Sequence, residues 1–131
     1  MKTAIDSYCY HRFFGEVYPQ QPAPPGRMTI EEFLHRAHEL RVEGVSLESC
    51  FIPSLDPAYL ASLRDLLDEY RLERVFAWGH PDGLEGGANR NAYRQMIRCF
   101  ESARLIGAAV MRVVGSSLMF RNQRTVRSWS A

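Results

Sequence analysis

The chain has 131 residues, of which 46% are hydrophobic and 24% are charged, and its formal net charge is +1 at pH 7. This length suits one domain and is too short for two. The near-neutral charge gives no electrostatic reason to expect nucleic acid or an anionic membrane as a partner. Because no segment resembles a signal peptide or approaches the ~20 apolar residues that span a bilayer, we expect a cytoplasmic protein.

Short apolar segments alternate with amphipathic ones along most of the chain. We predict strands at residues 3–7, 45–48, 75–80 and 110–114 and three helices between them. Such alternation is typical of parallel strands joined by crossover helices, that is, of an α/β fold. In these folds ligands bind at the carboxyl ends of the strands, so we expect a site there.

The connection after the first strand is unusually long. It takes about twenty residues, whereas strand-to-helix loops usually take about 2–6. Four prolines disfavour helix within it, and it holds four aromatic side chains: Tyr10, Phe13, Phe14 and Tyr18. We interpret it as a lid or binding loop; the alternative is a loop whose aromatic side chains simply pack over the site.

The three helices have recognisable starts. Thr29 and Glu32 have capping-box spacing, and Asp56 followed by Pro57 is a favoured N-cap pair. The third helix begins near Asn89 or Asn91 and ends at Gly107. The residues that we expect to face inward from it are Tyr93, Met96, Ile97, Phe100 and Ala103.

Polar side chains with useful chemistry follow the predicted strands. Glu48 ends the second strand, where a carboxylate can act as a base, orient hydroxyls or bind metal. Arg112, inside the fourth strand, offers donors to a carboxylate or phosphate. The alternative for both is a structural ion pair between them, or between Arg112 and Asp6.

Further residues at these ends are candidates for substrate binding. His80 ends the third strand, and Trp78 lies near the end of that strand. His11 lies in the long connection, where an accessory binding role is plausible because imidazole both donates and accepts hydrogen bonds. Tyr8 and Ser116 follow the first and fourth strands.

The chain also contains three cysteines and a basic segment at residues 121–131. Cys9, Cys50 and Cys99 lack zinc-finger spacing and read as reduced thiols. A zinc site formed by Cys9, His11, Cys50 and His80 is a less favoured alternative. Residues 121–131 contain three arginines without periodicity, and we expect an irregular basic tail.

Residues 5–11 (Ile-Asp-Ser-Tyr-Cys-Tyr-His), 44–48 (Gly-Val-Ser-Leu-Glu) and 75–80 together resemble the xylose isomerase-like TIM-barrel superfamily, and most closely its sugar phosphate isomerases and epimerases. The resemblance covers residues 1–120 and implies about four parallel strands with three crossover helices, the amino-terminal half of a (β/α)8 barrel. It matches Glu48 to the glutamate that often ends the second strand, which we take as catalytic, and His80 to a frequent substrate-contacting histidine. From their own positions we also assign His11, Trp78 and Arg112 to substrate binding.

The resemblance also implies an activity and a cofactor. Such enzymes isomerise or epimerise a sugar or polyol by proton transfer beside a carbonyl, aided by Mn, Mg or Zn. The family's metal ligands come from strands five to eight, so we expect this chain to lack them and to be inactive alone. One alternative is an apurinic-site endonuclease-like repair barrel; another is a non-enzymatic half-barrel that forms a homo-oligomer through exposed strand edges.

Overall fold

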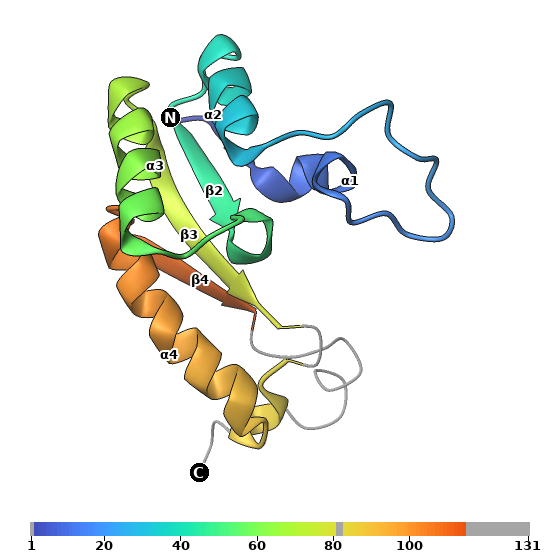
Figure 1. Ribbon diagram of the computed structural model, residues 1–131, viewed down its shortest axis with the longest axis vertical. Helices are drawn as coiled ribbons and strands as arrows, with labels where there is room; N and C mark the ends of the chain where they lie inside the picture. Colours follow the sequence, from blue (N-terminus) through green and yellow to red (C-terminus); the bar gives the residue numbers. More distant parts are fainter. Residues whose placement is uncertain (1, 81–82, 115–131) are drawn as a thin grey trace.

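The computed structural model describes residues 2–80 and 83–114 of the chain (Figure 1). The predicted tail at residues 121–131 and the candidate Ser116 lie outside these residues. No helix in the described part is long and apolar enough to cross a membrane.

Four parallel strands form one sheet in the order β1-β2-β3-β4. They are β1 (Ala4–Asp6), β2 (Gly44–Glu48), β3 (Glu73–Gly79) and β4 (Val110–Val114). The predicted α/β class and the parallel sheet are therefore confirmed, and the predicted bounds differ from the observed ones by at most two residues at any strand end. Sequential strands are spatial neighbours throughout, as crossover connections of one hand produce.

Three helices cover one face of this sheet: α2 (Ile30–Glu39), α3 (Pro57–Glu69) and α4 (Arg90–Leu105). Figure 1 shows α3 and α4 on the same side of β3 and β4. The capping box is present at α2: Glu32 N donates to Thr29 Oγ1 at 3.2 Å, and Thr29 N donates to Glu32 Oε2 at 2.7 Å. Asp56 precedes α3 as predicted, but its side chain accepts from Ser54 Oγ and makes no cap hydrogen bond.

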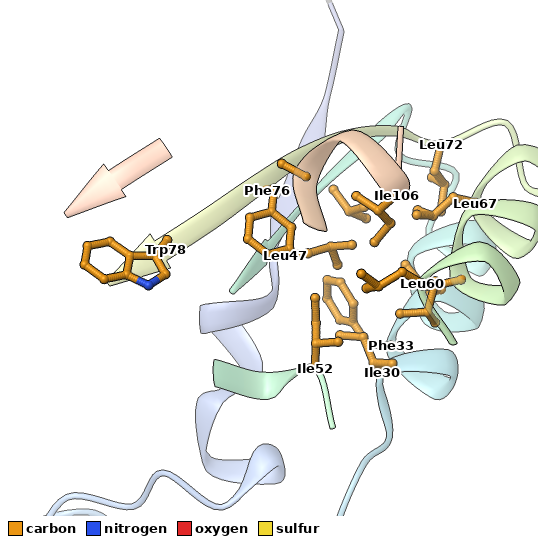
Figure 2. Close-up of a cluster of buried hydrophobic side chains, with 14 of the residues drawn as sticks. Ile30, Phe33, Leu47, Ile52, Leu60, Leu67, Leu72, Phe76, Trp78 and Ile106 are labelled. Carbon is orange, nitrogen blue, oxygen red and sulfur yellow. The ribbon is translucent and has the colours of Figure 1, made fainter. Parts of the chain in front are cut away.

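The core lies between these helices and the sheet, as Figure 2 shows. Val45 and Leu47 of β2 and Phe76 of β3 are buried in it, because alternate residues of a strand point to opposite faces. The helices contribute a set of fully buried apolar side chains: Ile30, Phe33, Leu34, Leu60, Leu63 and Leu67. The opposite face of the sheet is left to smaller and polar side chains.

The orientation predicted for α4 is wrong for three of its five residues. Tyr93, Ile97 and Phe100 are 40%, 47% and 50% exposed, although Ala103 is buried and Met96 half-buried as expected. The buried face instead carries small side chains: Ala92, Cys99, Ser102 and Ala103. Small residues let the helix approach the sheet closely, and the apolar arc of α4 is wider than the surface that it covers.

The long connection is more ordered than a simple loop. It begins with the turn η1 (Ser7–Tyr10) and the short helix α1 (His11–Phe14), which Gly15 ends in the left-handed conformation. The connection is tied back to α1, because Met28 N donates to Phe13 O at 3.0 Å and Arg12 Nη1 donates to Pro22 O at 3.0 Å.

Candidate functional site

A hollow of about 760 Å³ lies at the carboxyl ends of the four strands. It is lined by the last residue of every strand, namely Asp6, Glu48, Gly79 and Val114. The rest of its wall is formed by Tyr8, Cys9, Glu16, Tyr18, Cys50, His80 and Arg112. This is the position at which we expected a site, since parallel strands bring their carboxyl ends to one edge.

Strand register explains why Glu48 and Arg112 meet. Glu48 is paired with Ala77, and Ala77 with Arg112, so all three side chains point to the face away from the helices. The central residue carries only a methyl group. The long side chains on either side therefore reach each other across it.

These side chains form a cluster of ion pairs at the carboxyl ends of the strands. Arg112 Nη2 donates to Glu48 Oε1 and, at 3.2 Å, to Asp6 Oδ2. Asp6 Oδ1 in turn accepts from Tyr8 N at 2.9 Å, and Glu48 N donates to Ser7 Oγ at 2.9 Å. The ion-pair alternative raised for Glu48 and Arg112 is thus present in the structure, and it positions both groups inside the hollow.

The protonation chemistry of the hollow follows from burial. Glu48 is only 9% exposed, and this burial raises the pKa of its carboxyl above the ordinary value. Asp6 and Glu16 raise this pKa further, whereas Arg112 opposes the shift. A carboxyl with a raised pKa takes up and returns a proton closer to neutral pH than an ordinary one.

Cys50 also lines the hollow, close to the same carboxyls, although its side chain is more exposed than that of Glu48. Burial, with the neighbouring Glu48 and Glu16, raises the pKa of its thiol to about 11. The thiol is therefore protonated at neutral pH and is a poor nucleophile, since the thiolate is the reactive form.

One wall of the hollow is a chain of hydroxyls. The Tyr8 and Tyr18 hydroxyls share a hydrogen bond, and the Tyr18 hydroxyl donates to Glu16 Oε1 at 2.7 Å. These bonds to Tyr8 and Glu16 raise the pKa of Tyr18. The Tyr8 ring also stacks on the His11 ring, with centroids 4.9 Å apart.

Of the five predicted site residues, three line the hollow: Glu48, His80 and Arg112. His11 does not line it. The His11 ring ties the connection together instead, with Nδ1 2.9 Å from Tyr8 O and Nε2 3.1 Å from Gln21 Oε1. Gln21 Oε1 also accepts from Tyr18 N at 3.1 Å, so His11 supports the wall from behind.

Trp78 is placed in the core rather than in the hollow. It is 2% exposed and shares the helix-covered face of β3 with Phe76 (Figure 2). The alternation of small Val75, Ala77 and Gly79 with large Phe76 and Trp78 is the signal that points to this placement. The Trp78 ring lies 6.5 Å from that of His80, so it supports the histidine from the core side.

Sequence reasoning missed Glu16 and Tyr18 as site residues and considered Asp6 only as an ion-pair partner. Glu16 and Tyr18 both belong to the connection after α1; Tyr18 was considered only as one of four aromatic side chains of a lid or binding loop, and nothing in the sequence singled out Glu16. Asp6 carried a usable signal, because it directly follows the apolar Ile5 at the end of a short strand.

The donor set of the described residues does not fit a metal centre. Among residues 2–80 and 83–114, no group of three or more His, Cys, Asp or Glu side chains is arranged to hold an ion. Two carboxylates of the hollow are engaged by Arg112. The zinc alternative fails on geometry, since Cys9, Cys50 and His80 line the hollow but His11 does not.

A second hollow, of about 730 Å³, lies at the amino ends of the strands. Four of its charged residues are already paired with one another: Lys2 with Glu73, and Arg74 with Asp68. In parallel α/β folds, ligands bind at the carboxyl ends of the strands rather than at the amino ends. The hollow at the carboxyl ends is therefore the candidate site.

The comparisons with known proteins add no identification. No protein-family model matches the sequence, and no curated protein matches it. What the chain does is therefore inferred from the hollow and its residues.

Proposed function

We propose that the chain contributes the first four strands of a xylose isomerase-like barrel and that its hollow binds a sugar or polyol for isomerisation or epimerisation. One observation supports this most directly: Glu48, His80 and Arg112 come from three different strand ends and line the same hollow. Convergence of proton-transfer and hydrogen-bonding groups at strand ends is the usual construction of an active site in α/β barrels.

The chemistry follows from the environment of each group. In the proposed reaction the Glu48 carboxylate removes a proton from the carbon beside the substrate carbonyl. The C–H bonding electrons then form the enediolate double bond, and the carbonyl oxygen takes the negative charge. In isomerisation the proton returns to the former carbonyl carbon, and the hydroxyl proton of the neighbouring carbon passes to the former carbonyl oxygen, which leaves the new carbonyl at that neighbouring carbon. In epimerisation a second proton donor protonates the other face of the same carbon, and the carbonyl forms again at its original position.

The neighbouring cation and hydroxyls suit this reaction. Arg112 is close enough to Glu48 to donate to substrate oxygens beside it, and guanidinium donors stabilise a developing oxyanion. Tyr8 and Tyr18 provide hydroxyl partners for substrate hydroxyls at the wall. In the barrels that the sequence resembles, a divalent metal polarises the carbonyl; the residues described here do not fit such a centre, and we assign no step to it.

Binding by the chain itself is the first test. A titration with aldoses and ketoses, followed by amide chemical shifts, should perturb residues of the hollow and leave Glu43 and Glu73 at the amino ends unchanged. Glu48→Gln and Arg112→Lys should weaken binding, and Glu73→Gln is the matched control at the other end of the sheet. Shifts confined to the amino ends, or equal affinity in Glu48→Gln, would remove the hollow from consideration.

Turnover is tested in a barrel completed by strands five to eight. Exchange of the C2 proton of the substrate with deuterated solvent reports the proposed proton abstraction directly. We expect Glu48→Gln to abolish this exchange while the substrate still binds. An unchanged exchange rate would show that another group is the base.

A second candidate function is supported by the exposed apolar surface of α4 and β4. Tyr93, Ile97 and Phe100 line one side of the helix, and Val110 and Val113 are exposed on the edge strand. Surfaces of this kind are typical of interfaces, so we propose self-association of half-barrels as the alternative. Sedimentation analysis distinguishes the two states: an ordered dimer lost in Ile97→Asp supports assembly, and a monomer argues against it.

The repair-endonuclease alternative has less support. The described residues that line the hollow include three carboxylates, from Asp6, Glu16 and Glu48, and one guanidinium, from Arg112. A DNA backbone is bound through positive charge, so this lining disfavours it.

A further inference from the structure

We propose that, within the sugar- or polyol-binding function inferred above, the hollow selects its ligand by charge and takes amine-bearing polyols in preference to neutral ones, and neutral ones in preference to phosphorylated ones. This inference rests on the proposed function, and it names the substrate class for the same site. It follows from the arrangement of charges in the hollow.

Acidic side chains outnumber basic ones around the hollow. Among the described lining residues, Asp6, Glu16 and Glu48 are acidic and Arg112 is the one permanent cation. Three carboxylates against one guanidinium leave a negative potential. A walled hollow concentrates such a potential, because water screens it less than on an open surface.

The Arg112 guanidinium already binds two carboxylates of the hollow. Arg112 Nη2 donates to both Glu48 and Asp6. A phosphate that recruited Arg112 would take it from Glu48, which is almost fully buried. Leaving a buried carboxylate without its cation is costly, so a phosphate that needs the charge of Arg112 is disfavoured among the described lining residues, whereas a substrate hydroxyl or carbonyl oxygen can accept a hydrogen bond while Arg112 stays on Glu48.

Loss of a proton is disfavoured for two acids of the hollow. The pKa values of Glu48 and Cys50 are both raised, first by burial, and Glu16 adds to the shift in each case. Burial disfavours a charge of either sign, whereas the carboxylate of Glu16 disfavours a second negative charge in both cases. This repulsion of anions is an attraction for a cation at the same place.

We place the ammonium group of the ligand beside Glu16. Glu16 Oε1 accepts from the Tyr18 hydroxyl, and no Lys, Arg or His of the described residues forms an ion pair with Glu16. The rings of Tyr8 and Tyr18 line the same side of the hollow. A carboxylate beside aromatic rings is a favourable environment for an ammonium group.

A matched set of three ligands tests the proposal: glucosamine, glucose and glucose 6-phosphate, titrated into the chain at neutral pH and low salt. We expect glucosamine to bind about tenfold more tightly than glucose and glucose 6-phosphate about tenfold more weakly, the ratio expected for one favourable or unfavourable charge interaction. High salt should reduce both ratios. Glu16→Gln should lower the glucosamine-to-glucose ratio, and Glu43→Gln, at the other end of the sheet, is the control.

The outcomes separate the two proposals. If glucose 6-phosphate binds as tightly as glucose or more so, the charge selection is wrong and the sugar-binding function stands. If none of the three ligands binds, the proposed function is overturned together with the inference. A glucosamine preference that Glu16→Gln leaves intact would overturn the role of Glu16.

Discussion

Replacing Arg112 by methionine tests the arrangement on which the site depends. Arg112→Met keeps most of the length of the side chain and removes its charge. Glu48 and Asp6 then lose the cation that holds them together. Because the side chain of Glu48 is only 11% exposed, water cannot fully replace that cation.

The expected cost lies between two limits. Exposed ion pairs contribute about 0.2–1 kcal/mol, and removal of one partner from a buried pair costs about 3–5 kcal/mol. The Arg112 side chain is 45% exposed, so solvent screens part of the interaction. We therefore expect Arg112→Met to lower the free energy of unfolding by about 1–2 kcal/mol at neutral pH.

The assay is urea unfolding followed by far-UV circular dichroism, at neutral pH and again in acid, where Glu48 is protonated and needs no cation. The cost of Arg112→Met should shrink in acid. It should also shrink in a Glu48→Gln background, because the two changes act on one interaction. Arg104→Met, which breaks an exposed pair with Glu101, is the control and should change little. An equal cost at both pH values and in both backgrounds would refute the ion-pair geometry.

Three further outcomes follow from the structure. Because the pKa of Glu48 is raised, its contribution to stability is fully present below the ordinary value of 4.5 and is lost as the pH rises through the folded-state pKa. Glu48→Gln should therefore lose less stability between acid and neutral pH than the parent chain does. Urea midpoints that change in parallel for the two proteins would contradict this. Thr29→Ala removes the capping box of α2 and should cost about 1 kcal/mol, measured in the same assay, and an unchanged midpoint would show that the cap contributes nothing. On α4, Ala103→Asp should lower the free energy of unfolding by about 3 kcal/mol or more, whereas Ile97→Asp should change it by no more than about 0.5 kcal/mol. If thermal unfolding gave the reverse order, α4 would have the orientation that was first expected from the sequence.

Short stretches of sequence are enough to predict the helices and strands of this fold. The capping box of Thr29 and Glu32 and the alternating pattern of residues 73–79 each involve groups within a few positions of one another, so they can be recognised without knowing the rest of the chain. The α/β class follows from their order along the sequence. The position of the hollow follows too, since parallel strands end at a common edge.

The face of α4 that is buried was decided by tertiary packing. The helix carries two neighbouring apolar stripes, one with Tyr93, Ile97 and Phe100 and one with small residues such as Ala92 and Ala103. Helical periodicity alone does not choose between them. The choice depends on how closely the backbone of α4 can approach β3 and α3, and small side chains allow the closer approach.

The sequence likewise predicted only some of the residues that form the site. Glu48, His80 and Arg112 could be named from their positions at strand ends, but their contacts depend on register, which pairs Glu48 with Ala77 and Ala77 with Arg112 across two separate strands. Glu16 and Tyr18 reach the hollow through a connection whose path is determined by contacts with α1 and His11. Local sequence therefore determined which elements form and where their ends gather, whereas long-range pairing decided which charges meet there, because those contacts join residues separated by 64 and 106 positions along the chain.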